Sequence, residues 1–184
     1  MQLADTDKDV LTHIAHDSVR YTIEHSEEMP IALSDFSDAL NDEGATFVTL
    51  KYNNKVIGCM GSLSAHRPLV EDVVHNAFSA SYHDSRFPDP KTIEPEKIQI
   101  YISLLSPAEE IKFNSEQALI SAIRPGTDGL ILSDKQQRGT FLPSVWESIP
   151  DPESFLKQLK RKAGLPTDYW SDTLKVHRYT TEYW

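Results

Sequence analysis

Hydrophobic positions recur along the chain with two periods, and each period predicts a different kind of element. Apolar residues spaced three or four apart predict amphipathic helices over residues 10–21, 69–78, 118–123 and 155–163. Runs rich in β-formers, or alternating apolar with polar positions, predict strands over residues 46–52, 55–63 and 98–104. A second hairpin is expected over residues 129–143, and the aromatic, β-branched tail 173–184 predicts one final strand.

Turn and cap residues indicate where these elements begin and end. Asp5 or Thr6 is available to cap the first helix, and residues 24–44 have the composition of a long polar connection. The pair Asn53-Asn54 tolerates the positive φ of a tight turn, which predicts a hairpin. Residues 151–166 carry nearly every signal of a well-capped helix.

These elements predict an α+β fold in which helices pack on antiparallel sheets. Strands and helices alternate irregularly and the hairpins are short, which argues against a parallel, doubly wound sheet. A chain of 184 residues is long enough for one ordinary domain or for two small lobes that share the chain. We expect a single domain over residues 1–184.

The charge balance limits the partners. With 28 acidic against 18 basic residues the net charge is −10, a field that opposes phosphate backbones and anionic lipids. We therefore expect no nucleic-acid binding and no membrane binding. The opening residues lack the basic and apolar regions of a secretory signal, which predicts a cytoplasmic protein.

A single cysteine, Cys59, restricts the chemistry further. It excludes an internal disulfide and the several cysteines of a zinc ribbon or an iron–sulfur site. His13 and His16 share one helical face, but no third ligand accompanies them. We expect no metal site, and the sequence leaves the cofactor unknown.

Three long stretches carry a resemblance to a known family. They are residues 56–89, 98–111 and 129–170. Together they resemble the AMMECR domain family. The segment "FLPSVWESIPDPESFL" is similar to the bacterial branch of that family, the AmmeMemoRadiSam system protein A type. The resemblance runs from about Phe47 to Trp184. It implies a two-lobed α+β domain without an established activity, in a pathway shared with a radical S-adenosylmethionine enzyme and a Memo-like protein.

The family's hexapeptide, Leu-Arg-Gly-Cys-Ile-Gly, corresponds here to "VIGCMG", and its Asp-Pro-Arg-Phe-Pro segment corresponds to "DSRFP". The matching positions are Gly58, Cys59, Gly61, Asp84, Arg86, Phe87 and Pro88. Ile57 occupies the position of the family's arginine. Because a nearby cation lowers the pKa of a thiol, this change removes the neighbour best suited to activate Cys59.

Two interpretations of Cys59 follow from the hairpin. Side chains two apart in a strand share a face, so residue 57 is expected beside the thiol. A two-residue turn sets Cys59 opposite Val48, which predicts a buried, inert thiol; a longer loop sets it opposite Thr49. Alternatively Cys59 is a nucleophile. In the structural interpretation, Gly58 and Gly61 permit close backbone approach.

The remaining candidates each have a functional and a structural interpretation. Arg86 binds an anion, or it pairs with Asp84 or caps exposed carbonyls at the end of the preceding helix. His66 is a general base or ligand, or a surface histidine. Arg138 binds an anion beside Arg86, or is an exposed hairpin charge. The basic run within residues 157–162 is expected to be a solvated face.

Two classes of function remain. In the first, the protein is a binding or accessory module that docks the pathway proteins. In the second, it is an enzyme with a pocket between the lobes, where Cys59, Arg86, Asp84 and the two glycines would converge. The sequence supplies no nucleophile, base and orienting group with a known spacing, which favours the first class.

Overall fold

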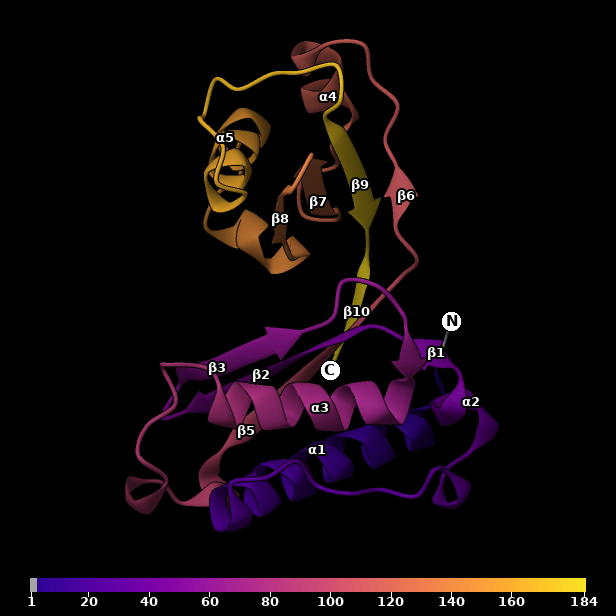
Figure 1. Cartoon of the computed structure of the whole chain (residues 1–184), viewed down its shortest axis with the longest axis vertical. Coiled ribbons are helices and arrows are strands. Elements are labelled where there is room, and N and C mark those ends of the chain that lie inside the picture. The colour runs from indigo at the N-terminus through magenta and orange to yellow at the C-terminus, as the bar shows by residue number, and fades with distance from the viewer. Residues whose placement is uncertain (1–2) are drawn as a thin grey trace. The chain divides into compact units, whose positions relative to one another are not determined.

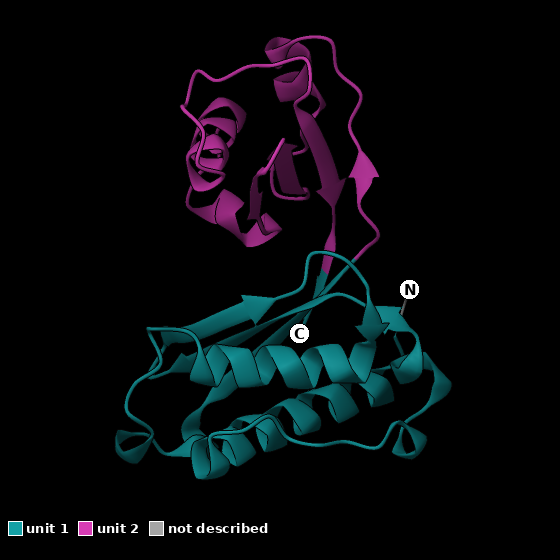
Figure 2. Ribbon diagram, in the orientation of Figure 1, with its two compact units in different colours: residues 1–105, 182–184 teal, residues 106–181 magenta. Residues whose placement is uncertain are grey.

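The structure is a computed structural model that describes residues 3–184, and it consists of two compact units (Figures 1 and 2). Unit 1 comprises the described residues as far as Leu105 together with Glu182–Trp184. Unit 2 comprises Ser106–Thr181. Unit 2 is thus inserted between the third and fourth strands, in chain order, of the main sheet of unit 1. Our expectation of one domain over residues 1–184 stays a prediction.

Unit 1 holds a four-stranded sheet of order β10-β5-β2-β3 and a small β1-β4 ladder. β2 pairs antiparallel with both β3 and β5. The elements are α1 (Asp5–His25), η1 (Leu33–Asp35), α2 (Asp38–Asn41), β1 (Glu43–Gly44), β2 (Thr46–Tyr52), β3 (Lys55–Gly61), β4 (Arg67–Pro68), α3 (Leu69–Tyr82), η2 (Pro90–Thr92), η3 (Pro95–Lys97), β5 (Gln99–Leu105) and β10 (Thr181–Tyr183).

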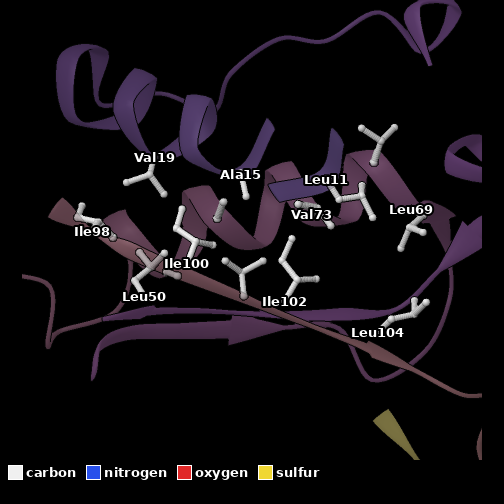
Figure 3. Packing of buried hydrophobic residues seen from close by; sticks show 14 of the residues in the cluster. Leu11, Ala15, Val19, Leu50, Leu69, Val73, Ile98, Ile100, Ile102 and Leu104 are labelled. Atoms are coloured by element: carbon white, nitrogen blue, oxygen red, sulfur yellow. The ribbon is translucent and has the colours of Figure 1, made fainter. Parts of the chain in front are cut away.

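The core of unit 1 lies between this sheet and the two long helices, α1 and α3. Figure 3 shows Leu11, Ala15 and Val19 of α1 facing the same space as the β5 isoleucines, Ile100 and Ile102. The alternating pattern of β5 explains this arrangement, since every second side chain of a strand points to the same face. The amphipathic pattern of the sequence therefore places both helices on one side of the sheet.

Unit 2 is also α+β and is built on an antiparallel sheet of order β6-β9-β7-β8. The buried core lies beneath α5, where the Trp146 ring stacks on Phe155 with centroids 3.7 Å apart. The elements are β6 (Glu109–Glu110), α4 (Glu116–Ala122), β7 (Gly129–Asp134), β8 (Gln137–Phe141), η4 (Pro143–Glu147), α5 (Pro152–Lys162) and β9 (Lys175–Tyr179).

The α+β prediction with antiparallel sheets is confirmed, and three local predictions are wrong. The tail forms two strands in different sheets, β9 and β10, because the chain passes from unit 2 back to unit 1. Ala4 occupies the cap position of α1, so neither Asp5 nor Thr6 caps it. Residues 24–44 include η1, α2 and β1 besides the connection. Of the helices within residues 3–184, none has the length and apolarity that crossing a membrane requires.

Candidate functional site

The β2–β3 hairpin positions the candidate cysteine. Asn53 and Asn54 have φ of 50° and 62° and form the predicted two-residue turn, which pairs Tyr52 with Lys55. A β-bulge follows, because Lys51 pairs with Val56 while Leu50 pairs with Gly58. Ile57 is the extra residue. The bulge shifts the rest of the strand by one position.

This shift overturns the register expected from a two-residue turn. Cys59 lies opposite Thr49 and not opposite Val48. Val48 is fully buried in the core, whereas Thr49 and Cys59 are half-buried on the other face of the sheet. Ile57 packs against the core of unit 1, so the expectation that residue 57 lies beside the thiol is also wrong. The bulge breaks the two-residue alternation on which that expectation rested.

The two glycines of the hexapeptide lie where side chains do not fit. A Cβ at Gly58 would lie 2.2 Å from the carbonyl oxygen of Ala80, because β3 runs directly against α3. A Cβ at Gly61 would lie 2.3 Å from the ring of Phe47, its cross-strand partner. Close packing thus accounts for both glycines without a ligand.

The thiol of Cys59 accepts one hydrogen bond in the described part of the chain. The Thr49 hydroxyl donates this bond to Sγ at 3.3 Å. The backbone N–H of Cys59 donates to Asp84 Oδ2 at 2.9 Å. The hairpin is thereby tied to the loop that follows α3.

Asp84 and Arg86 form a bidentate ion pair. Arg86 Nε lies 2.9 Å from Asp84 Oδ1, Arg86 Nη2 lies 2.6 Å from Oδ2, and the Arg86 backbone N–H donates to Oδ1 at 3.0 Å. The guanidinium, followed by the backbone N–H groups of Arg86 and Cys59, holds the pKa of Asp84 well below its usual range, against the opposing effect of burial. The Asp84 side chain is 8% exposed and that of Arg86 is 52% exposed. The pair is therefore built on a buried carboxylate and an accessible cation.

The other two candidates are placed elsewhere. His66 is exposed; its Nδ1 lies 2.8 Å from the Ser64 carbonyl oxygen and its Nε2 lies 2.7 Å from Arg67 Nη2. Arg138 is an exposed residue of β8, opposite Ser133, and it belongs to unit 2. The structure thus joins Cys59, Asp84 and Arg86 by direct bonds, and no bond within residues 3–184 ties His66 or Arg138 to them.

Sequence reasoning missed a buried polar network beneath the same hairpin. Asp72 of α3 is fully buried and accepts hydrogen bonds from Thr46 (backbone N–H and hydroxyl, both 2.8 Å), Ser62 Oγ (2.5 Å) and Asn76 Nδ2 (3.0 Å). Arg67 Nε lies 3.6 Å from Asp72 Oδ1. The available signal was the spacing of Asp72 and Asn76, four residues apart within the apolar stripe of α3. The network fixes both ends of the hairpin to α3.

The chemistry open to the Cys59 group is limited. A catalytic thiol requires a base within hydrogen-bond reach. Within residues 3–184 no histidine or free carboxylate bonds to Sγ, and the nearby carboxylate, Asp84, is engaged by Arg86. Nor do the described residues bring three or more His, Cys, Asp or Glu side chains together as a metal site would. The arrangement is suited to presenting a cation and a small polar surface.

The protein is thus an α+β protein of two compact units, in which a Gly-Cys-x-Gly strand is bonded to an Asp-x-Arg loop. The chain belongs to the AMMECR1 family, whose family model matches residues 12–184. A protein of Methanothermobacter thermautotrophicus is 35% identical over 150 residues, which cover 80% of this chain and 78% of that protein. A Thermotoga maritima protein is 31% identical over 168 residues, covering 89% and 88%.

A solved structure supports the same assignment. The crystal structure of an uncharacterized protein from Pyrococcus horikoshii matches with a TM-score of 0.87 and 28% sequence identity. The match covers 100% of this chain and 93% of that one. Both units are therefore similar to parts of one solved chain.

Proposed function

We propose that this protein is a non-catalytic binding subunit of the AmmeMemoRadiSam type, acting in the cytoplasm with a radical S-adenosylmethionine enzyme and a Memo-like protein. One observation carries the proposal: the Asp84 carboxylate, which the backbone N–H of Cys59 contacts, is already bound to Arg86. It cannot serve as a free general base while it holds these bonds. The bonds among Cys59, Asp84 and Arg86 keep the loop after α3 in place and leave the Arg86 side chain half exposed, which suits recognition of a partner.

The assignment to the bacterial branch rests on the segment 141–156. In unit 2 this segment forms the end of β8, η4 and the start of α5, and its residues Trp146 and Phe155 are buried. Packing explains the buried apolar residues of this segment. The likeness of the whole segment to the bacterial branch is what supports the shared pathway, which we propose.

Co-purification tests the proposal. The tagged chain, expressed in a bacterium that encodes both pathway proteins, is expected to retain one or both of them. The variant R86A should retain less, whereas K157Q, which changes an exposed lysine of unit 2, should retain the normal amount. Failure to retain either protein from cells that contain both would refute the accessory role.

A second candidate function is catalysis by Cys59 with Arg86 as the anion-binding group. The observation that favours it is the bridge through Asp84, which fixes the arginine close to the backbone of the cysteine. Thiol labelling separates the two proposals. The binding role predicts that native Cys59 reacts more slowly than the same thiol in unfolded chain, because Sγ is half-buried and lacks an activating base. A native thiol that reacts faster than the unfolded one would favour catalysis.

A further inference from the structure

Unit 2 contains a cavity of about 430 Å³ at the point where two paired strands separate. β6 and β9 are paired at Glu110 and His177, and the last ladder bond runs from Ile111 N–H to the Val176 carbonyl. Beyond it the chains diverge, and residues 110–114 and 170–175 form the walls of the cavity. The volume lies within the roughly 300–1,000 Å³ of small-molecule sites.

The walls combine aromatic rings with charges of both signs. Phe113 and Trp170 form an aromatic corner, with ring centroids 5.6 Å apart and planes inclined by 58°. On one wall Glu110 is paired with Lys112. On the other wall Asp172 and Lys175 are exposed, and the charge of Lys175 also acts on Glu110 across the cavity. Within residues 3–184 neither Asp172 nor Lys175 forms a direct salt bridge, so one acid and one base face solvent beside an aromatic surface.

A buried carboxylate fixes the wall that carries these two charges. Asp134, at the end of β7, accepts hydrogen bonds from Tyr169 Oη, Ser171 Oγ and Thr173 Oγ1, each at 2.6 Å. Its side chain is buried, and the three bonds lower the pKa of Asp134 to about 2. The segment on either side of Trp170 is therefore held at three points.

A buried cation, Lys160, contacts the same segment around Trp170. Lys160 has no exposed surface; its Nζ lies 2.5 Å from Glu116 Oε1, 3.4 Å from the Thr167 carbonyl oxygen and 5.9 Å from the centroid of the Trp170 ring. Burying a charge costs free energy unless it is paired. A loop that only connected α5 to β9 would not need the buried charges of Asp134 and Lys160. A binding wall that must keep its shape before the ligand arrives gains from such support.

We propose that this cavity binds a small zwitterion that carries an aromatic ring, of the size of a free aromatic amino acid. The ring packs into the corner formed by Phe113 and Trp170. The ammonium group pairs with Asp172 and the carboxylate pairs with Lys175. The site is independent of Cys59 and Arg86, so it goes beyond the accessory role proposed above.

Calorimetric titration with L-phenylalanine tests the proposal on the full chain. Saturable binding is expected, and three analogues each remove one feature: L-alanine lacks the ring, phenethylamine lacks the carboxylate and 3-phenylpropionate lacks the ammonium group. Each should bind at least about ten-fold more weakly, because a charge-assisted bond or an aromatic contact is lost. Absence of saturation, or equal binding of L-phenylalanine and L-alanine, overturns the proposal.

Two variants locate the site. K175Q should weaken binding of L-phenylalanine about ten-fold and leave binding of phenethylamine unchanged, since only the carboxylate contact is removed. K157Q, on α5 and away from the cavity walls, is the matched control and should bind like the unaltered protein. Lys175 is exposed, so its change does not threaten folding. Equal effects of the two variants would contradict the site, whereas co-purification with pathway proteins tests the accessory role separately.

Discussion

The carboxylate of Asp84 lies 2.9 Å from the backbone nitrogen of Cys59, a residue 25 positions earlier in the chain. β3 is an edge strand, so its outward N–H groups face no further strand within residues 3–184. Asp84 satisfies one of them and is itself held by Arg86. The cysteine motif and the "DSRFP" segment are therefore one structural unit.

Removing this carboxylate should destabilise unit 1. We expect D84A to lower the free energy of unfolding by about 2 kcal/mol, because a buried, charge-assisted set of hydrogen bonds is lost. Urea denaturation measures the change. D17N breaks the exposed Asp17–Arg20 pair on α1 and should cost less than about 0.5 kcal/mol. Similar losses in the two variants would contradict the role given to Asp84.

The close approach of Gly58 to Ala80 leads to a second prediction, on the stability of the variant G58A. G58A places a methyl group 2.2 Å from a backbone carbonyl oxygen, so β3 or α3 must move. We expect a loss of about 3 kcal/mol in the free energy of unfolding. G126A is the control, since its Cβ meets open space and only its φ of +76° opposes the change. It should cost about 1 kcal/mol, and an equal or larger cost than G58A would refute the packing argument.

Asp134 predicts a defined dependence of stability on pH. Its pKa is about 2 in the folded chain, below the roughly 3.9 of an unfolded aspartate. The folded state therefore gains stability from Asp134 above about pH 4, and this gain is lost as the pH falls toward 2. D134N should be less stable than the unaltered chain at pH 7, and the difference should shrink between pH 4 and pH 2.

Urea midpoints at pH 7, 4 and 2.5 measure this difference. Asp84, whose pKa is also lowered, contributes equally to both chains and so cancels in the comparison. A difference between the two chains that does not change with pH would show that folding does not lower the pKa of Asp134.

Two variants of the Lys160–Glu116 pair, E116Q and K160M, separate the free-energy cost of burying a charge from the cost of losing a contact. E116Q leaves the buried ammonium group with a neutral partner and should cost about 3 kcal/mol. K160M removes the buried charge itself and leaves a carboxylate that water can reach, since the Glu116 side chain is 37% exposed. We expect K160M to be the milder change in urea denaturation. The opposite order would mean that the other contacts of Lys160, with the Thr167 carbonyl oxygen and the Trp170 ring, outweigh the cost of burying its charge.

The sequence predicted what short-range patterns determine. The alternation in β5, the stripe of α3 and the Asn53-Asn54 turn all follow from residues close together in the chain. The pairing of Arg86 with Asp84, two residues apart, was one of two alternatives that the sequence offered. The bond from the Cys59 backbone to Asp84 spans 25 positions, and no local pattern indicates it. The bulge at Ile57 likewise has no local signal, and it gives a two-residue turn the Cys59–Thr49 pairing that was expected of a longer loop.

The basic run of α5 shows a different limit. Lys157, Arg161 and Lys162 are exposed as expected, but Lys160 is buried, so the prediction of a fully solvated face is wrong. Position 160 lies four residues after Leu156 and therefore on the apolar stripe of the helix. Its partner Glu116 belongs to α4, and such a distant pairing cannot be read from one helix.

The return of the chain to unit 1 has a consequence for biosynthesis. Trp184 exchanges backbone hydrogen bonds with Ile102 at 3.0 and 3.2 Å, and its indole N–H donates to Thr12 Oγ1 at 3.1 Å. A ribosome delivers the chain from the N-terminus, so all of unit 2 emerges before the strand that completes the sheet of unit 1. Unit 1 begins first and is completed last, and until β10 emerges the side of β5 that it will occupy is an unpaired sheet edge.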